Sequence, residues 1–195
     1  IVPYKVFPAV MGGQKGIALF YKYFSTLVSF ACFTVKSNQA NESYTILNQM
    51  PDSKTRYVNP FIFFRIKKIA TENDCTHLLF EHPYFAWMIF LFKHFTSFNI
   101  IVHSHNIESE RFKSIGKWWW KLLWYYEGMA YRNADNVWFK TKEDMEYARL
   151  YFKLKNQHCA TIPYGIEANS LPATEELSQA RKQLLDLYHL DEHVN

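Results

Sequence analysis

Short apolar runs separated by longer amphipathic stretches constrain the fold of this chain more than any other feature. Leu78-Leu79-Phe80 and Ile100-Ile101-Val102 are two such runs. A strand buried on both faces gives a short continuous apolar run, whereas a covering helix shows apolar side chains at every third or fourth position. The alternation therefore predicts an α/β fold, with a mostly parallel sheet flanked by helices.

Placing elements on this pattern gives an ordered set of expected strands and helices. Strands are expected at residues 2–8, 30–35, 44–47, 76–81, 99–103, 136–140 and 160–163. Helices are expected after Gly16, over 61–73 and 84–95, within 109–132, and over 142–152. Thr141 precedes Asp144 by three residues, a spacing typical of a helix start. Residues 168–190 are polar with a helical pattern, which predicts a linker and terminal helix after a domain of residues 1–167.

Composition narrows the functional classes. At 195 residues and 49% hydrophobic, the chain can bury the core of one domain. Its net charge of +4 is spread along the sequence without an arginine-rich arm, which disfavours nucleic acid and fits an anionic small substrate or an acidic membrane surface. Cys32, Cys75 and Cys159 form no C-x-x-C pair, so we expect neither a disulfide framework nor a thiolate metal site, and a cytoplasmic location. The longest apolar run, residues 84–92, is about half of the roughly 20 residues that a spanning helix needs, so it predicts a core helix.

The first candidate site is a glycine segment between a predicted strand and a predicted helix. Gly12, Gly13 and Gly16 would let backbone N–H groups approach a phosphate at the positive end of a helix dipole. Neither the dinucleotide fingerprint nor the P-loop pattern is present. A tight turn that needs positive φ angles is the alternative.

Polar residues follow two of the predicted strands at the point where each ends. One run is Glu81-His82-Pro83 and the other is His103-Ser104-His105-Asn106-Ile107-Glu108. In open α/β sheets ligands bind outside the carboxyl ends of the strands, so we expect one shared pocket. Histidine and carboxylate side chains there can bind hydroxyl groups or transfer protons near neutral pH. A zinc site and histidines that satisfy buried backbone groups are the alternatives.

A tryptophan-rich segment is the last feature that singles itself out. Residues 117–126 read Lys-Trp-Trp-Trp-Lys-Leu-Leu-Trp-Tyr-Tyr, and their aromatics cover nearly the whole circumference of a helix. The lack of a clean polar face favours a helix buried in the core or at a domain interface. An interfacial membrane helix, with Lys117 and Lys121 extending to the lipid headgroups, is the alternative.

Taken together, these residues resemble the N-terminal domain of family 4 glycosyltransferases, from Val2 to about Glu167. The segments that agree in order are Met11-Gly12-Gly13, the strand that ends in His105-Asn106, and Tyr131-Arg132-Asn133-Ala134-Asp135-Asn136-Val137 before Thr141-Lys142-Glu143-Asp144. Ile162-Pro163-Tyr164-Gly165-Ile166-Glu167 is similar to the "IPNGVD" hinge that ends this domain in the family.

The resemblance implies one Rossmann-like half of a GT-B fold and a retaining, metal-independent enzyme that needs no cofactor. The donor would be a UDP- or GDP-linked sugar and the acceptor a glycan or lipid-linked saccharide, which would place the enzyme at the inner face of the membrane. Gly12 and Gly13 would lie against the donor diphosphate, and His105 would act beside the transferred sugar. The residues expected on the acceptor side are His82, His103, Asn106 and Glu108.

The family's second domain carries an E-x7-E nucleotide-sugar motif, and the sequence ends near Asn195, where that domain is expected to begin. We therefore expect this chain alone to be inactive. Two other functions stay open: a GT-B sugar-nucleotide epimerase, and a non-catalytic module that binds a glycan or nucleotide.

Overall fold

The computed structural model describes residues 1–39, 42–154, 158–167 and 174–189. The chain divides into two units, Ile1–Gly165 and Ile166–Asn195. In the second unit, helix α7 (Thr174–Tyr188) has no buried residue and occupies part of the predicted terminal helix. Residues 168–173 of the predicted linker, and Leu190 at the end of that helix, lie outside the described residues.

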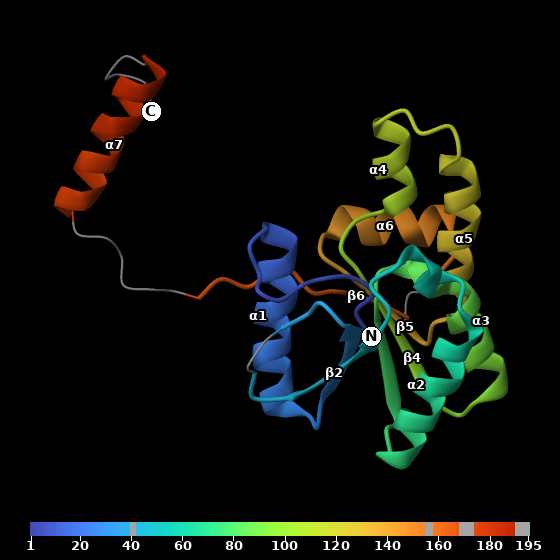
Figure 1. Ribbon diagram of the computed structural model, residues 1–195. Helices are drawn as coiled ribbons and strands as arrows, with labels where there is room; N and C mark the ends of the chain where they lie inside the picture. Colours follow the sequence, from blue (N-terminus) through green and yellow to red (C-terminus); the bar gives the residue numbers. More distant parts are fainter. Residues whose placement is uncertain (40–41, 155–157, 168–173, 190–195) are drawn as a thin grey trace. The chain divides into compact units, whose positions relative to one another are not determined.

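The first unit is built on parallel strands, as Figure 1 shows. They are β1 (Ala31–Val35), β2 (Thr45–Met50), β3 (His77–Glu81), β4 (Asn99–Ser104), β5 (Asn136–Phe139) and β6 (Cys159–Thr161). β1 pairs with β2, and the other strands form a sheet in the order β3-β4-β5-β6. The N-terminal residues join the two sheets, because the Val2 amide donates to the Phe33 carbonyl and the Glu81 amide donates to the Ile1 carbonyl. The result is the mostly parallel sheet that the apolar runs predict.

The expected strand at residues 2–8 is wrong beyond its first residue. Val2 forms an isolated parallel bridge with Thr34, but Pro3 has no N–H to continue the ladder. The next amides find another acceptor, since Val6 and Phe7 both donate to the Asn38 side-chain oxygen at 2.6 Å. A side chain from a distant loop thus replaces a neighbouring strand.

The helices follow the expected order, and no helix is described between β1 and β2. They are α1 (Gly12–Leu27), α2 (Pro60–Glu72), α3 (Ala86–Phe95), α4 (Glu108–Ser114), α5 (Trp120–Asn133) and α6 (Lys142–Tyr151), with short 3-10 turns η1 (Lys54–Tyr57) and η2 (Pro83–Phe85). The predicted start of α6 is confirmed, because the Thr141 side chain accepts from the Asp144 amide at 3.1 Å. The stretch 109–132 holds two helices, because the chain turns at Gly116 with a φ of 70°.

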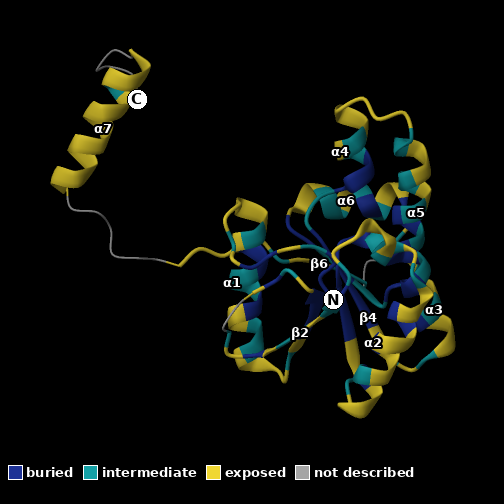
Figure 2. Cartoon of the chain, viewed as in Figure 1, coloured by how far each residue is buried: buried dark blue, intermediate teal, exposed yellow. Residues whose placement is uncertain are grey.

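Alternate side chains of each central strand enter two different cores, so both faces of the sheet are covered. Leu78, Phe80, Ile100 and Val102 join the larger core with α2, α3, α5 and α6, whereas Leu79 and Ile101 join the smaller core with α1. Figure 2 shows the resulting buried centre between exposed outer faces of the helices. The predicted core helix is confirmed, with Met88, Ile89 and Phe92 of α3 fully buried. Within the described residues, no helix is both long and apolar enough to cross a membrane.

The tryptophan-rich segment is only partly buried, so the prediction that it lies in the core is wrong for its first residues, and a place at a domain interface stays a prediction. Trp118 is 89% exposed, and Trp119, Trp120 and Trp124 are half-buried. Burial begins further along α5, at Glu127, Gly128, Ala130 and Tyr131. The N-terminal half of this helix therefore presents aromatic side chains on the surface of the first unit.

Candidate active site

The carboxyl ends of β3 and β4 bring three ionisable side chains together. The two strands are paired in register, so Glu81 lies opposite His103. Both side chains lie on the face of the sheet that α1 covers, where the Phe20 ring lies 4.8 Å from the His103 ring. His105 follows two residues later and its ring centroid lies 4.8 Å from that of His103. The sequence pattern predicts this meeting, because parallel strands end at one edge.

A buried carboxylate is the centre of this cluster. One Glu81 oxygen lies 3.1 Å from His103 Nδ1, and the other lies 2.7 Å from His105 Nε2. Burial by itself would raise the pKa of Glu81, but the charges and hydrogen bonds of the two histidines hold it well below its usual range. Glu81 is therefore ionised and accepts a hydrogen bond from each imidazole.

His105 is neutral in this setting, because burial lowers its pKa to about 4 even though Glu81 favours the charged form. An ionised carboxylate can only accept, so the hydrogen-bond network assigns the His105 proton to Nε2. Nδ1 then carries the lone pair and lies 2.9 Å from the Tyr164 hydroxyl. Glu81 thus determines the tautomer of His105, and the Tyr164 hydroxyl can donate to the free Nδ1.

Tyr164 links His105 to the first helix. A Cβ atom at Gly16 would lie 2.1 Å from the Tyr164 ring, so only glycine permits this close approach. The Lys140 ammonium lies 4.6 Å from the centre of the same ring, and burial lowers the pKa of Lys140 to about 8. A cation therefore lies beside the site, one contact away from His105.

The two glycines predicted to lie on the donor side begin the same helix. Gly12 and Gly13 are exposed, and a Cβ atom added to either would meet nothing within 4 Å. Neither has a positive φ angle, so the tight-turn interpretation of these glycines is wrong. They form the first turn of α1, where backbone N–H groups lack partners within the helix.

His82 lies directly against His105. The two rings stack with centroids 4.6 Å apart, and His82 also contacts the Tyr84 ring at 5.1 Å, the Tyr4 ring at 5.7 Å and a Glu108 oxygen at 3.2 Å. Its backbone has φ 64° and ψ 163°, a region that is essentially restricted to glycine and costs about 1–3 kcal/mol. Strain of this kind concentrates at functional sites, which supports a role for His82 beyond packing.

Glu108 closes the polar cluster at the first residue of α4. Arg111 Nη2 donates to its carboxylate at 2.7 Å, and the Asn106 amide, oriented to satisfy its neighbours, donates to it at the same distance. Burial would raise the pKa of Glu108, but His82 and Arg111 lower it to about 2. Glu108 is thus a negative charge that contacts His82, and the His82 ring stacks on His105.

A second buried carboxylate holds the start of α4 in place. Glu127 of α5 accepts from the Glu108 amide at 2.8 Å and from both the amide and the hydroxyl of Ser109. The Tyr131 hydroxyl donates to the same carboxylate at 2.8 Å. These bonds satisfy N–H groups that a helix start leaves free. They also position Glu108 at the site.

Three possible metal ligands also meet here. Donor atoms of Glu81, His103 and His105 all lie within 4.8 Å of one another. The hydrogen bonds from the two histidines to Glu81 account for this spacing without a cation. His103 is fully buried and contacts both Glu81 and the His105 ring.

The structure adds residues that sequence reasoning did not select. Glu81 lies in the polar run Glu81-His82-Pro83, but only its neighbour His82 was predicted as a site residue. Tyr164 stood in the hinge-like segment, and Lys140 directly follows β5. No local pattern predicts that Tyr164 packs on Gly16, because the two residues are far apart in the chain.

The sequence matches no protein-family model and no curated protein. Solved structures do resemble the fold. A sucrose-phosphate synthase structure from Thermosynechococcus elongatus has a TM-score of 0.54 and 15% identity, over 97% of this chain and 98% of that one. A glycosyltransferase from Rickettsia africae has a TM-score of 0.57 and 16% identity, over 99% of this chain and 50% of that one. The chain thus spans about half the length of the second structure. The predicted α/β fold, with a mostly parallel sheet flanked by helices, is confirmed.

Proposed function

We propose that this chain is the acceptor-side half of a retaining glycosyltransferase similar to family 4. It would help transfer a sugar from a UDP- or GDP-linked donor to a glycan or lipid-linked acceptor. The observation that carries the proposal is the neutral His105, held in one tautomer by Glu81 and stacked on His82 at the carboxyl edge of the sheet. The likeness in fold to two glycosyltransferase structures supports it.

His105 would act on the sugar as a neutral hydrogen-bonding group. Its Nε2–H is held by Glu81, so the Nδ1 lone pair is the group that a hydroxyl can reach. The Tyr164 hydroxyl takes that place in this structure, and a donor sugar hydroxyl offers the same chemistry. A hydrogen bond that strengthens as charge develops lowers the barrier, which is how a neutral histidine contributes to transfer.

The donor diphosphate would lie over the first turn of α1. Gly12 and Gly13 leave open space there for a ligand to approach the backbone N–H groups. The buried Lys140 adds a positive charge that favours an anionic donor on this side of His105. No metal is required by this arrangement, because a helix N-terminus and a lysine supply the positive field.

The acceptor would lie on the opposite side, toward His82, Asn106 and Glu108. His103 would contribute indirectly, because its ring is buried behind Glu81. Carboxylate and imidazole groups bind sugar hydroxyls well, which suits a saccharide acceptor. A lipid carrier on that saccharide would place the enzyme at the inner face of the membrane.

The test is a panel of UDP- and GDP-sugars with the full-length protein, with and without saccharide acceptors, followed by nucleotide release and product analysis. We expect one donor to give acceptor-dependent release and a product of retained configuration. Conversion of the donor without an acceptor would indicate an epimerase, and binding without any turnover would indicate a non-catalytic module. Either result would contradict the proposal.

A companion measurement uses the 195-residue chain alone. If most donor contacts lie in a second domain, calorimetry should detect at most weak donor binding. Micromolar affinity for a UDP-sugar would show that this chain holds the donor by itself, and would overturn the division into donor and acceptor halves.

A further inference from the structure

The turn between α4 and α5 and the first turns of α5 expose four large apolar side chains. Ile115 is 56%, Trp118 89%, Leu122 73% and Tyr125 65% exposed. Leu122 and Tyr125 are three positions apart on α5, the spacing that places side chains on one helix face, and Trp118 lies in the turn just before the helix. We call this set the tip surface, together with the neighbouring Lys117 and Lys121.

The charge around the tip surface has one sign. Between residues 111 and 126 the sequence contains one arginine and three lysines and no acidic residue. Arg111 and Lys113 pair with Glu108 and Glu110, respectively. Within the described part of the chain, no ion pair involves Lys117 or Lys121. The exposed apolar stripe is therefore flanked by positive charges that are available to an anionic surface.

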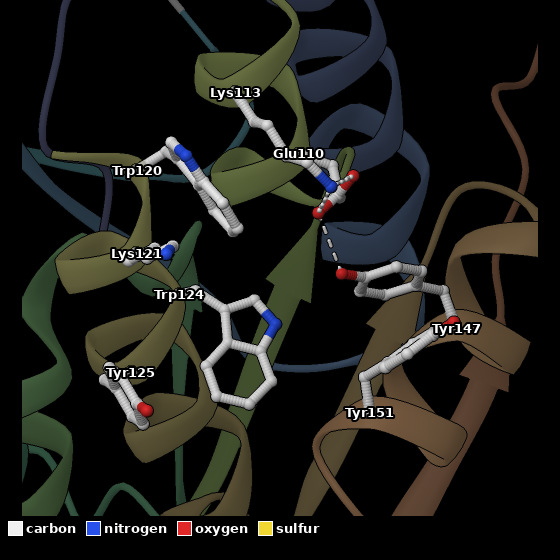
Figure 3. Close-up of a pocket in the computed structure, with 8 residues that line it drawn as sticks. All are labelled: Glu110, Lys113, Trp120, Lys121, Trp124, Tyr125, Tyr147 and Tyr151. Carbon is white, nitrogen blue, oxygen red and sulfur yellow. Dashed lines mark hydrogen bonds and ion pairs between the residues drawn. The ribbon is translucent and has the colours of Figure 1, made fainter. Parts of the chain in front are cut away.

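A cavity of about 400 Å³ opens beside the stripe, where α4, α5 and α6 meet. Figure 3 shows the rings of Trp120, Trp124 and Tyr147 pointing toward it, with Lys113 and Lys121 on the same side as Trp120. Its one acidic lining residue, Glu110, is paired with Lys113 at 3.1 Å and accepts from the Tyr147 hydroxyl at 2.9 Å. The cavity thus combines aromatic walls with ammonium groups.

We infer that the tip surface docks on an anionic lipid bilayer, with Trp118, Leu122 and Tyr125 entering the headgroup region. Tryptophan and tyrosine prefer the boundary between lipid and water, and lysines beside them attract anionic headgroups. The aromatic cavity would receive a lipid phosphate near Lys113 and Lys121. The exposed lysines and the amphipathic aromatic side chains both match a lipid surface, and no observation points to a protein partner. The inference is independent of glycosyl transfer.

The experiment is vesicle co-sedimentation of the chain with phosphatidylcholine vesicles and with vesicles that contain 30% phosphatidylglycerol. We expect binding to the anionic vesicles, weakening as NaCl rises from 0.1 to 0.5 M, and little binding to the neutral ones. Lys117→Ala/Lys121→Ala should lower the partition coefficient by on the order of 10- to 30-fold, because each lysine near the surface contributes about 1 kcal/mol. Trp118→Ser/Leu122→Ser should lower it by about tenfold or more.

A matched control removes similar apolar area from another helix. Phe61 and Phe64 of α2 are 77% and 63% exposed, so Phe61→Ser/Phe64→Ser should keep full vesicle binding. An equal loss in this control would overturn the assignment of the surface. All four residues are exposed, so unchanged melting temperatures should accompany both pairs of substitutions.

Two further outcomes contradict the inference. One is recovery of the chain in the supernatant with both vesicle types. The other is a concentration-dependent dimer in light scattering that Trp118→Ser/Leu122→Ser abolishes, which would assign the tip surface to a second copy of the chain. Quenching of tryptophan fluorescence by brominated acyl chains, lost in Trp118→Phe, would support insertion directly.

Discussion

The two halves of α5 use similar residue types in opposite environments. The C-terminal half buries Glu127 and Tyr131 in a network that positions Glu108 at the candidate active site. The N-terminal half and the turn before it leave Tyr125 and Trp118 exposed beside lysines without ion pairs in the described chain. Buried polar groups are costly unless they are paired, so the paired C-terminal half contributes stability and site geometry. The exposed N-terminal half contributes little to stability and is available for contacts outside the chain.

The largest contrast should appear when one side chain is removed from the buried C-terminal half and one from the exposed turn that precedes the helix. Glu127→Ala leaves the donors of Glu108, Ser109 and Tyr131 without their acceptor in a buried place, which should cost about 3 kcal/mol or more of unfolding free energy. Trp118→Ala should stay within about 0.5 kcal/mol of the wild type. Urea denaturation measures both. Similar values for the two variants would remove the distinction between the halves.

Acid should destabilise the buried site selectively. The folded-state pKa of His105 is about 4, below its ordinary 6.5, so the unfolded chain binds more protons between these values. The free energy of unfolding should therefore fall as the pH decreases from 6.5 to 4, by up to about 3 kcal/mol. Glu108, with a pKa of about 2 against 4.5, adds a second loss between pH 4.5 and 2.

Substitutions can show which residue causes the loss of stability in each of these two pH ranges. His105→Asn should flatten the dependence between pH 6.5 and 4, and Glu108→Gln should flatten the lower window. Trp118→Ala should follow the wild-type curve at every pH. If the unfolding free energy of the wild type stays constant from pH 6.5 to 4, His105 is not held neutral by burial.

Two glycines provide the smallest and most local comparison. A Cβ atom at Gly128 would lie 2.8 Å from the Phe152 ring, so Gly128→Ala should destabilise the chain by about 1–3 kcal/mol through overpacking. Gly116 has open space but a φ of 70°, so Gly116→Ala should cost only about 1 kcal/mol through backbone strain. Thermal unfolding compares them, and a neutral Gly128→Ala would show that this part of α5 packs loosely.

Much of the fold follows from local signals that the sequence displays openly. Apolar runs located β3, β4 and β5, and Thr141 located the start of α6, because burial and capping depend on neighbouring residues. The prediction of a strand at residues 2–8 was wrong because its outcome depends on a distant residue. Asn38, more than 30 residues away, provides the acceptor that ends its pairing.

The candidate site was also predictable in part. Parallel topology implies that Glu81 and His105 meet, since both end strands at one edge. The partner of His105 Nδ1 was not predictable, because it is the Tyr164 hydroxyl and therefore depends on how Tyr164 packs against Gly16. The periodicity of the tryptophan-rich segment favoured burial, and the turn at Gly116 explains why Trp118 is exposed.

The most direct test of the proposed site replaces His105 in the full-length protein, with kinetics and thermal unfolding measured on one preparation. His105→Ala should lower kcat by about 10- to 1,000-fold, the scale of one well-placed hydrogen-bonding group, with a small change in melting temperature. Tyr164→Phe is the matched control, because it removes only the hydroxyl that contacts Nδ1. The account predicts a folded His105→Ala protein that binds substrates and transfers sugar slowly. A folded His105→Ala protein with wild-type kcat would contradict it.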